Sequence, residues 1–399
     1  MTPDQRQAIL RLLAQGQDRE TIAAAVDVTP GQVSAVLAHV KMGTYALPNP
    51  DAVPGAQAAR LTEPTAADKP ANVLELLQHP GDDTANDAQV RPILLGSDAE
   101  SGKAVYWNPD PASGTANPHV LILGESGTGK TYAIGCLTAE LAQQGIVSIV
   151  FDYGQGFSRR GLPGEFVVAT DPVEIHVGRD GVDINPLQIF PSDVRGPVTV
   201  AQRVADTFAR VYKALGIQQH AVLRQAVLDI LADAGIHADM PDSWSARLPA
   251  FSTVQDKLAE LADEPRNSKA RLAASVASHI STLFVYNTFR PGGQRLNWSN
   301  TLAERHRVVV LQLYGLEYSL ERAVTEFLLW NLIGYIEALG PGPLRCFVVL
   351  DEAHKLSFDR GSPVEKLLRE GRKFGLGVIL ASQQPQDFSA VAFANTATK

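Results

Sequence analysis

The sequence has few cysteines, no long apolar run and no excess of positive charge. Only two of the 399 residues are cysteines, Cys136 and Cys346, which excludes a disulfide-dense secreted scaffold. Both lie in apolar stretches, so we expect two buried, reduced thiols rather than a disulfide. No run of about 18 apolar residues is available to cross a bilayer, and the N-terminus lacks the basic and apolar stretches of a signal sequence. These absences predict a cytoplasmic chain.

The charge balance is acidic rather than basic. The chain has 35 Lys and Arg against 43 Asp and Glu, a formal net charge of −8, which is not the usual balance of a nucleic-acid-binding protein. Net charge does not exclude a basic patch on one face, however. The apolar fraction of 45% is ordinary, which excludes wholesale disorder. A chain of this length usually folds into about two or three domains with a large core.

Residues 1–45 have the spacing of a helix-turn-helix unit, with helices expected at 4–15, 19–26 and 31–41. Apolar residues recur at i, i+3 and i+4 intervals and could share one small core. They are Ile9, Leu12, Leu13, Ile22, Ala25, Val33, Val36 and Leu37. The third helix offers polar side chains to DNA, namely Gln32, Ser34, His39 and Lys41. Basic and acidic residues balance in this unit, so contact with DNA and a protein-docking or purely structural role both remain open.

Residues 46–92 are rich in proline and alanine, which predicts a linker. After it, short β-branched runs alternate with helical periods, the pattern of a parallel sheet flanked by helices. We expect strands at 104–107, 119–124, 146–152, 307–313, 346–351 and 377–381. We expect helices between them at 130–143, 319–338 and 363–374. The sequence therefore predicts an α/β fold.

One segment departs from this alternation. From 197 to 296 the signal is almost entirely helical, with apolar stripes that include Val200, Val204, Leu223 and Val227. The simplest interpretation is a helical subdomain inserted into an α/β core. The core would then be formed by 93–196 and 297–399.

The strongest motif fulfils G-x-x-x-x-G-K-[ST] in full and comprises Gly124, Glu125, Ser126, Gly127, Thr128, Gly129, Lys130 and Thr131. It follows an apolar run and opens an amphipathic helix, which is the context that the motif requires. Backbone N–H groups of such a loop wrap a phosphate chain, and the helix N-terminus adds partial positive charge. We expect Lys130 to neutralise β- and γ-phosphate oxygens and Thr131 to place its hydroxyl on Mg²⁺.

A phosphate site of this kind needs acidic and polar groups from other strand ends. The apolar run 346–350 ends in Asp351 and Glu352, where a parallel strand next to the phosphate loop would deliver them. We predict that Asp351 joins Thr131 at the metal and that Glu352 is the general base for the attacking water. The run 377–381 is followed by Gln383, whose amide could sense the γ-phosphate or orient that water.

A basic edge lies between these two strands. Lys366, Arg369, Arg372 and Lys373 recur at helical spacing. Such an edge is either a solvated face or the source of an arginine finger, in which Arg369 or Arg372 reaches the γ-phosphate of a neighbouring subunit. No cysteine lies near any of the nine histidines at metal-ligand spacing, so we expect no structural zinc.

Several separately placed motifs together resemble the HerA/FtsK superfamily of RecA-like ATPases. They are closest to the HerA DNA translocases and the conjugative type IV secretion ATPases. The motifs lie at 117–131, 183–187, 308–316, 348–354, 371–375 and 381–384. The run from Asp351 to His354 also matches the DEAH box of superfamily 2 helicases, but the helical insertion and the lack of that family's arginine motif weigh against it.

The superfamily resemblance implies a hexameric ring that threads DNA and hydrolyses ATP with Mg²⁺ at subunit interfaces. On the family pattern, Lys130 and Thr131 match the phosphate and metal positions, Asp351 and Glu352 the metal and base positions, and Gln383 the polar sensor. Only the lining of a ring's pore has to be positive, which reconciles the acidic balance with DNA. The chain ends at Lys399, shortly after the sensor, which predicts a C-terminal truncation or a short sheet.

We therefore predict an ATP-driven DNA translocase of a bacterial DNA-processing, defence or transfer system, with a nuclease as a candidate partner. Two alternatives remain open. One is a DNA-binding regulator in which nucleotide binding repositions the helix-turn-helix unit. The other is a secretion ATPase that moves protein.

Overall fold

The computed structural model describes residues 3–14, 17–29, 33, 36, 90–110, 117–264, 268–303 and 308–398. These belong to two compact units, 1–70 and 71–399. Across the described ranges, we find no helix with the length and apolar character needed to span a membrane.

The described part of the first unit contains helices α1 (Pro3–Ala14) and α2 (Arg19–Val26). Asp18 caps α2 by accepting hydrogen bonds from the backbone N–H groups of Glu20 and Thr21, each at 3.0 Å. The small apolar core forms largely as expected, from Ile9, Ile22, Ala23, Val33 and Val36.

One expectation for this unit is wrong, and another concerns residues outside the described ranges. Ala25 is exposed, and the neighbouring Ala23 takes the core position instead, so the assignment of Ala25 is wrong. The polar residues of the expected third helix, at 32, 34, 39 and 41, lie outside the described residues, as does most of the linker. The helix-turn-helix unit thus remains a prediction.

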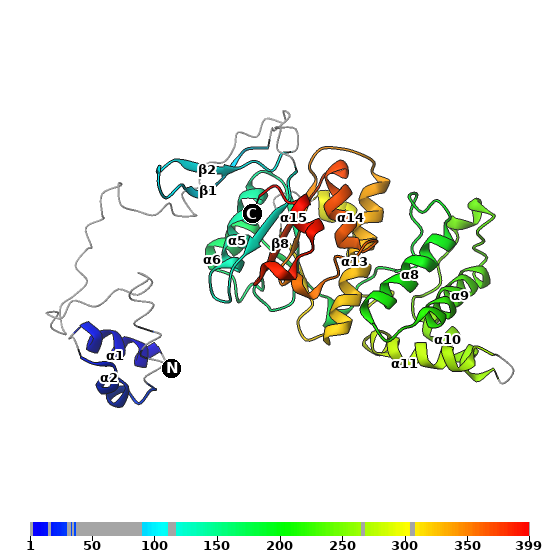
Figure 1. The fold of residues 1–399 in the computed structure, drawn as a ribbon, viewed down its shortest axis with the longest axis horizontal. Coiled ribbons are helices and arrows are strands. Elements are labelled where there is room, and N and C mark those ends of the chain that lie inside the picture. Colours follow the sequence, from blue (N-terminus) through cyan, green and yellow to red (C-terminus); the bar gives the residue numbers. More distant parts are fainter. Residues whose placement is uncertain are drawn as a thin grey trace. The chain divides into compact units, whose positions relative to one another are not determined.

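The second unit is built on a six-stranded parallel sheet, which confirms the predicted fold class (Figure 1). The strand order is β3-β8-β7-β4-β6-β5. Their bounds are β3 Val120–Leu123, β4 Val147–Asp152, β5 Val173–His176, β6 Val308–Gln312, β7 Cys346–Leu350 and β8 Leu376–Ser382. At the outer edge of β3, Thr398 forms an isolated parallel bridge with Val120.

The strand order corrects one expectation, because β8 lies between the phosphate-loop strand β3 and the acidic strand β7. All seven residues of β8 are buried, as a central strand requires. Gly377 lets it approach β7 closely, since a Cβ there would lie 2.2 Å from the ring of Phe347. The acidic pair after β7 therefore reaches the phosphate loop across β8 rather than from an adjacent strand.

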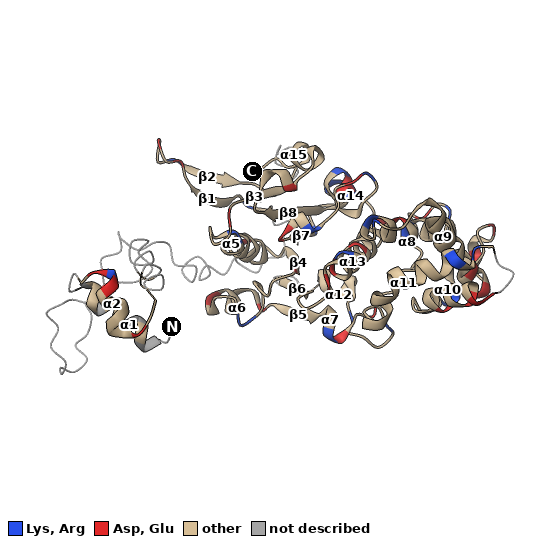
Figure 2. Ribbon diagram, turned by 60° about the horizontal axis from the view of Figure 1, so that its bottom comes forward, with Lys and Arg blue, Asp and Glu red and all other residues tan. Residues whose placement is uncertain are grey.

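The alternation of side chains along the strands separates two cores. Val150, Val310 and Val349 face helices α5 (Lys130–Gln143) and α6 (Gly164–Thr170). Phe151, Leu311 and Leu350 face helices α13 (Tyr318–Ala338) and α14 (Pro363–Glu370). Figure 2 shows these helix layers on opposite sides of the sheet. The result is a three-layer α/β core with both sheet faces covered.

The remaining elements refine the expected boundaries. The helix expected at 363–374 ends at Glu370, and a 3₁₀ turn continues over Gly371–Phe374. The strand expected at 104–107 forms, but as β2 (Ala104–Trp107) of an antiparallel hairpin with β1 (Ile93–Ser97), outside the parallel sheet. Short helices occur at α7 (Val177–Asp180), α12 (Trp298–Ala303) and α15 (Ala390–Asn395).

A helical segment leaves the sheet and packs on α13. It contains α8 (Pro197–Val211), α9 (Ile217–Asp233), α10 (Thr253–Asp263) and α11 (Ala270–Tyr286). The predicted stripes of Val200 and Val204, and of Leu223 and Val227, are buried. We call the contact between α8 and α13 the seam. At the seam, Arg210 pairs with Glu326 at 2.8 Å, with side chains only 12% and 2% exposed.

Candidate nucleotide site

The phosphate loop joins β3 to α5 at the carboxyl edge of the sheet. Gly127 and Gly129 have φ angles of +80° and +96°, a backbone region that side chains with a Cβ rarely adopt. A Cβ built at either position meets no atom within 4 Å, so open space lies beside the loop. The glycines thus give the loop its curvature and leave room for phosphate oxygens at the start of α5.

Lys130 points its ammonium group into this loop. Its Nζ donates hydrogen bonds to the carbonyl oxygens of Gly124 and Glu125, at 2.8 and 3.1 Å. Charged phosphate oxygens are stronger acceptors than neutral carbonyl groups. The position of Lys130 at the loop therefore fits the neutralisation of phosphate charge expected from the sequence.

Thr131 and Asp351 meet at this edge although 220 positions separate them in the chain, with Thr131 Oγ1 3.4 Å from Asp351 Oδ2. Burial raises the pKa of Asp351; the N–H of Glu352 opposes this rise, and the carboxylates of Glu352 and Asp152 add to it. A divalent cation would relieve the repulsion between these carboxylates.

This oxygen pair fits Mg²⁺. Mg²⁺ is usually bound through one or two protein oxygens, with substrate phosphates and water completing an octahedron. Thr131 and Asp351 provide a hydroxyl and a carboxylate beside the space at the loop. In the described ranges, no cluster of three or more His, Cys, Asp or Glu residues provides a metal site independent of phosphate.

Glu352 follows Asp351 in a strained backbone conformation. Its φ of 54° and ψ of 46° lie in the left-handed region, which costs a non-glycine residue roughly 1–2 kcal/mol. The Glu352 N–H donates to Asp351 Oδ1 at 2.9 Å, and its carbonyl accepts from Lys355 N–H at 3.0 Å. Strain held by local hydrogen bonds is common at functional sites because it aims a side chain. Here it fixes the start of the Glu352 side chain beside Asp351.

Gln383 lies beside the phosphate loop, because β8 pairs with β3 and places Ser382 opposite Leu123. The backbone N–H of Gly124 donates to the carbonyl of Ser382 at 3.3 Å. Gln383 itself is exposed, whereas Ser382 is buried. Gln383 thus directly follows the strand end that borders the loop, and its role as sensor stays a prediction.

Asp152, at the end of β4, is a site residue that the sequence analysis did not single out. Its carboxylate accepts hydrogen bonds from the N–H groups of Gly154, Gly156 and Phe157 and from the amide of Gln312, at 2.8–3.2 Å. A Cβ at Gly156 would lie 3.1 Å from the side chain of Thr131, so this turn packs against Thr131. The sequence feature that could have identified Asp152 is its place at the end of a buried strand, directly before a glycine-rich turn.

The structure does not bring Arg369 and Arg372 to the nucleotide site of their own chain. Arg369 lies in the last turn of α14 and pairs with Glu365 on the same helix. Arg372 is exposed in the turn that enters β8 at its amino end. The length of β8, about 3.3 Å per residue, separates that turn from the loop at the other end. Lys366, from the same basic edge, pairs with Glu337 at 2.6 Å.

The two cysteines are both free. Cys346 is buried as expected, whereas Cys136 on α5 is only partly buried, so the expectation of burial is wrong for that residue. Cys136 lies one helical turn from Tyr132, whose side chain is exposed and hydrogen-bonds to it.

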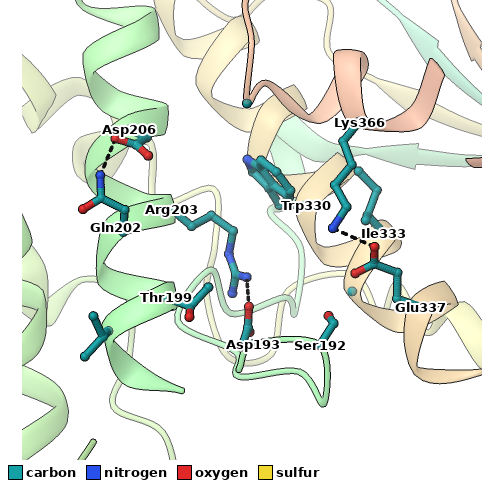
Figure 3. Close-up of a pocket in the computed structure, with 13 residues that line it drawn as sticks. Ser192, Asp193, Thr199, Gln202, Arg203, Asp206, Trp330, Ile333, Glu337 and Lys366 are labelled. Carbon is teal, nitrogen blue, oxygen red and sulfur yellow. Dashed lines mark hydrogen bonds and ion pairs between the residues drawn. The ribbon is translucent and has the colours of Figure 1, made fainter. Parts of the chain in front are cut away.

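A cavity of about 440 Å³ lies between α8 and the second half of α13, away from the phosphate loop (Figure 3). Its two cationic side chains are already paired: Arg203 with Asp193 at 2.6 Å, and Lys366 with Glu337 at 2.6 Å. Neither pair bridges α8 and α13. With both cations neutralised by acids of the chain itself, the cavity lacks the unpaired cations that a phosphate chain requires.

With this geometry established, the chain can be compared with known proteins. The family model of the helicase HerA central domain matches residues 112–332, more than half of the chain. The chain belongs to this family. The matched span includes the phosphate loop and the whole helical segment, and it confirms the resemblance to the HerA/FtsK superfamily.

Among solved structures, the similarity to VirB4 shows a shared fold. The structure of VirB4 of Thermoanaerobacter pseudethanolicus is 21% identical, with a TM-score of 0.60, and the match covers 76% of this chain and 80% of that chain. The unbound bacterial conjugative coupling protein TrwB is 18% identical over 70% and 66%, with a TM-score of 0.47. TrwB in complex with ADP and Mg²⁺ is 17% identical over the same shares, with a TM-score of 0.46. The comparison with curated protein sequences gave no match.

Proposed function

We propose that the chain is an Mg²⁺-dependent ATPase that drives DNA through a ring formed by its own copies. The observation that carries the proposal is the approach of Thr131 to Asp351 behind a complete phosphate loop, in a chain of the HerA family. Two residues on different strand connections approach each other at the start of α5, where they would hold a metal ion beside the γ-phosphate. If the glycines served only to join β3 to α5 without steric clash, an acid such as Asp351 would not be needed beside Thr131.

In this proposal, Lys130 binds phosphate oxygens, and Thr131 and Asp351 would hold Mg²⁺. The bound ion neutralises charge on the phosphates. Glu352 accepts the proton of the attacking water, and Gln383 orients that water or senses the γ-phosphate. Asp152 holds the turn that packs against Thr131. These residues come from four strand ends, which a parallel sheet gathers at one edge.

A ring completes the site in this proposal. Arg369 and Arg372 lie away from the site of their own chain, as a residue that acts on a neighbour's nucleotide would. An arginine supplied from the adjacent subunit would stabilise the charge that develops during hydrolysis. We propose Arg372 and Arg369 as the two candidates; Arg369 pairs with Glu365 on its own helix.

ATP turnover with and without sequence-random DNA tests the proposal. A motor that moves DNA should hydrolyse ATP severalfold faster when DNA is present, and its particle mass with ATP and DNA should correspond to a ring. Turnover indifferent to DNA would favour the secretion of protein instead. Tight binding to one DNA sequence without turnover would favour a nucleotide-controlled regulator.

A further inference from the structure

His354 connects the two halves of the site. Its Nδ1 atom lies 3.3 Å from Glu352 Oε2 and 3.4 Å from Ser382 Oγ. Ser382 is fully buried at the end of β8, and its hydroxyl donates to Asp387 Oδ2 at 2.5 Å. His354 therefore lies between the proposed base, which follows β7, and the strand end that precedes Gln383.

The available hydrogens fix the direction of the His354–Ser382 hydrogen bond. A serine hydroxyl has one hydrogen, and Ser382 uses it on Asp387. The Ser382 bond lowers the pKa of Asp387 below its ordinary value, so Asp387 remains an acceptor. A Glu352 carboxylate also has no hydrogen to donate. In the His354–Ser382 hydrogen bond, Nδ1 therefore carries the hydrogen, and the same Nδ1 lies within ion-pair distance of Glu352 Oε2.

Ser382 also contacts the phosphate loop. Its carbonyl oxygen accepts the N–H of Gly124, the first residue of the loop, at 3.3 Å. A continuous series of contacts thus runs from the loop through Ser382 and His354 to the carboxylate of Glu352. A shift of the loop or of the end of β8 would therefore change the position of His354 Nδ1 relative to the Glu352 carboxylate.

We propose that His354 is a positioning residue for Glu352, in that its Nδ1–H holds the carboxylate in a direction set by the end of β8 and the phosphate loop. The inference rests on the proposed ATPase function. It adds a condition to that function: the Glu352 carboxylate is aligned for catalysis only when the Ser382 carbonyl contacts the N–H of Gly124. His354 does not touch the nucleotide in this account and acts through Glu352 alone.

Two substitutions separate this role from a merely structural one. The amide nitrogen of asparagine can replace Nδ1 as a donor, whereas that of glutamine reaches the position of Nε2. We expect His354→Asn to retain kcat within about threefold of the wild type, and His354→Gln and His354→Ala to lower kcat at least ~10-fold. The dissociation constant for MgATP should change less than about twofold in all three, since Lys130 and Thr131 are intact.

A double-mutant cycle tests the connection to β8. We expect the single variant Ser382→Ala to lower kcat. Added to His354→Ala, the same substitution should lower kcat little further, because both variants remove the Ser382–His354 contact. His279→Ala, in the helical segment, serves as the control and should leave kcat unchanged. The full chain is used throughout, and melting temperatures identify any variant that has lost its fold.

Several results would overturn the inference. Equal kcat values for the asparagine and glutamine variants would remove the Nδ1–H from the mechanism, as would an unchanged kcat in His354→Ala. If the fold-changes in kcat of the His354 and Ser382 substitutions simply multiply in the double variant, the two side chains act independently and the proposed connection to β8 is wrong. If the wild-type chain binds MgATP without any turnover, the proposed function itself fails, a result distinct from normal turnover in the His354 variants.

Discussion

The carboxyl edge of the sheet and the seam between α8 and α13 differ in how their charged side chains are paired. At the seam, Arg210 and Glu326 neutralise one another at 2.8 Å inside the protein. At the edge, the acids Asp351 and Glu352 adjoin each other, and Lys130 contacts backbone carbonyl groups. Within the described parts of the chain, Lys130 forms no ion pair. Charges that the chain pairs for itself hold the fold, whereas charges left for an incoming group indicate a binding site.

Backbone geometry differs in the same way. The seam is made from regular helix, and its residues adopt ordinary helical angles. The edge contains positive φ angles at Gly127, Gly129 and Glu352. This comparison predicts that substitutions at the edge change chemistry with little effect on stability, and that substitutions at the seam do the reverse.

The largest expected effect is that of Glu352→Gln. The amide cannot accept a proton, so kcat for ATP should fall roughly 10²- to 10⁴-fold, while MgATP binding and the urea midpoint remain near the wild-type values. Steady-state turnover and equilibrium binding measure the two quantities. Glu370→Gln, on the exposed end of α14, is the matched control. Equal hydrolysis by Glu352→Gln and the wild type would remove this residue from the role of base.

Lys130→Ala should nearly abolish nucleotide binding. The ammonium group would make charge-assisted contacts to phosphate oxygens, so we expect the dissociation constant to rise at least ~100-fold. Stability should change little, because Lys130 gives up only two bonds to carbonyl oxygens. Titration calorimetry with MgATP provides the measurement, and Lys103→Ala, on an exposed loop, provides the control. Undiminished affinity in the Lys130 variant would mean that the nucleotide binds elsewhere.

Arg210→Ala should reverse this pattern at the seam. Removing the partner of a buried carboxylate costs about 3–5 kcal/mol, and it leaves Glu326, whose pKa burial already raises, without its guanidinium. We expect a lower urea midpoint and an unchanged dissociation constant for MgATP. The exposed pair of Arg179 and Asp180 supplies the control, since Arg179→Ala should not move the midpoint. A loss of nucleotide affinity equal to that of Lys130→Ala would erase the contrast between the two regions.

The smallest effect is the pH dependence of stability in Asp351→Asn. Burial raises the pKa of Asp351, so the native state binds its proton more readily than the unfolded chain. The contribution of Asp351 to the free energy of unfolding therefore falls as pH rises from 3.8, the ordinary pKa of the group, through the raised value. We expect Asp351→Asn to have a slightly higher urea midpoint at pH 7 and no advantage near pH 3.8.

Asp98 provides the opposite case for this experiment, because a hydrogen bond from Ser101 lowers its pKa. Asp98→Asn should therefore give no gain at pH 7. A wild-type chain more stable than Asp351→Asn throughout this pH range would contradict the assignment of an electrostatic cost to the site.

The sequence predicted those parts of the fold and site that local patterns encode. The helix Lys130–Gln143 was predicted with its observed bounds, because a phosphate loop fixes its start and an apolar stripe its extent. The continuous apolar runs of β4, β6, β7 and β8 were recognisable because both faces of each strand are buried. The approach of Thr131 to Asp351 followed from motif chemistry.

Other features depend on tertiary contacts. The placement of β8 between β3 and β7 is set by packing such as that of Gly377 on Phe347, which no local pattern records. The short strand Val173–His176 alternates too briefly to stand out from a loop. The role of Asp152 depends on a turn whose N–H groups converge only in the folded chain. The His354 contact needed both β7 and β8 in place.

The most direct test of the central claim is an experimental structure of the Glu352→Gln chain with ATP and Mg²⁺. The account predicts triphosphate density inside the loop 124–131, with Lys130 on phosphate oxygens and the metal between Thr131 and Asp351. A triphosphate bound elsewhere, or a metal held without either of these two residues, would contradict it.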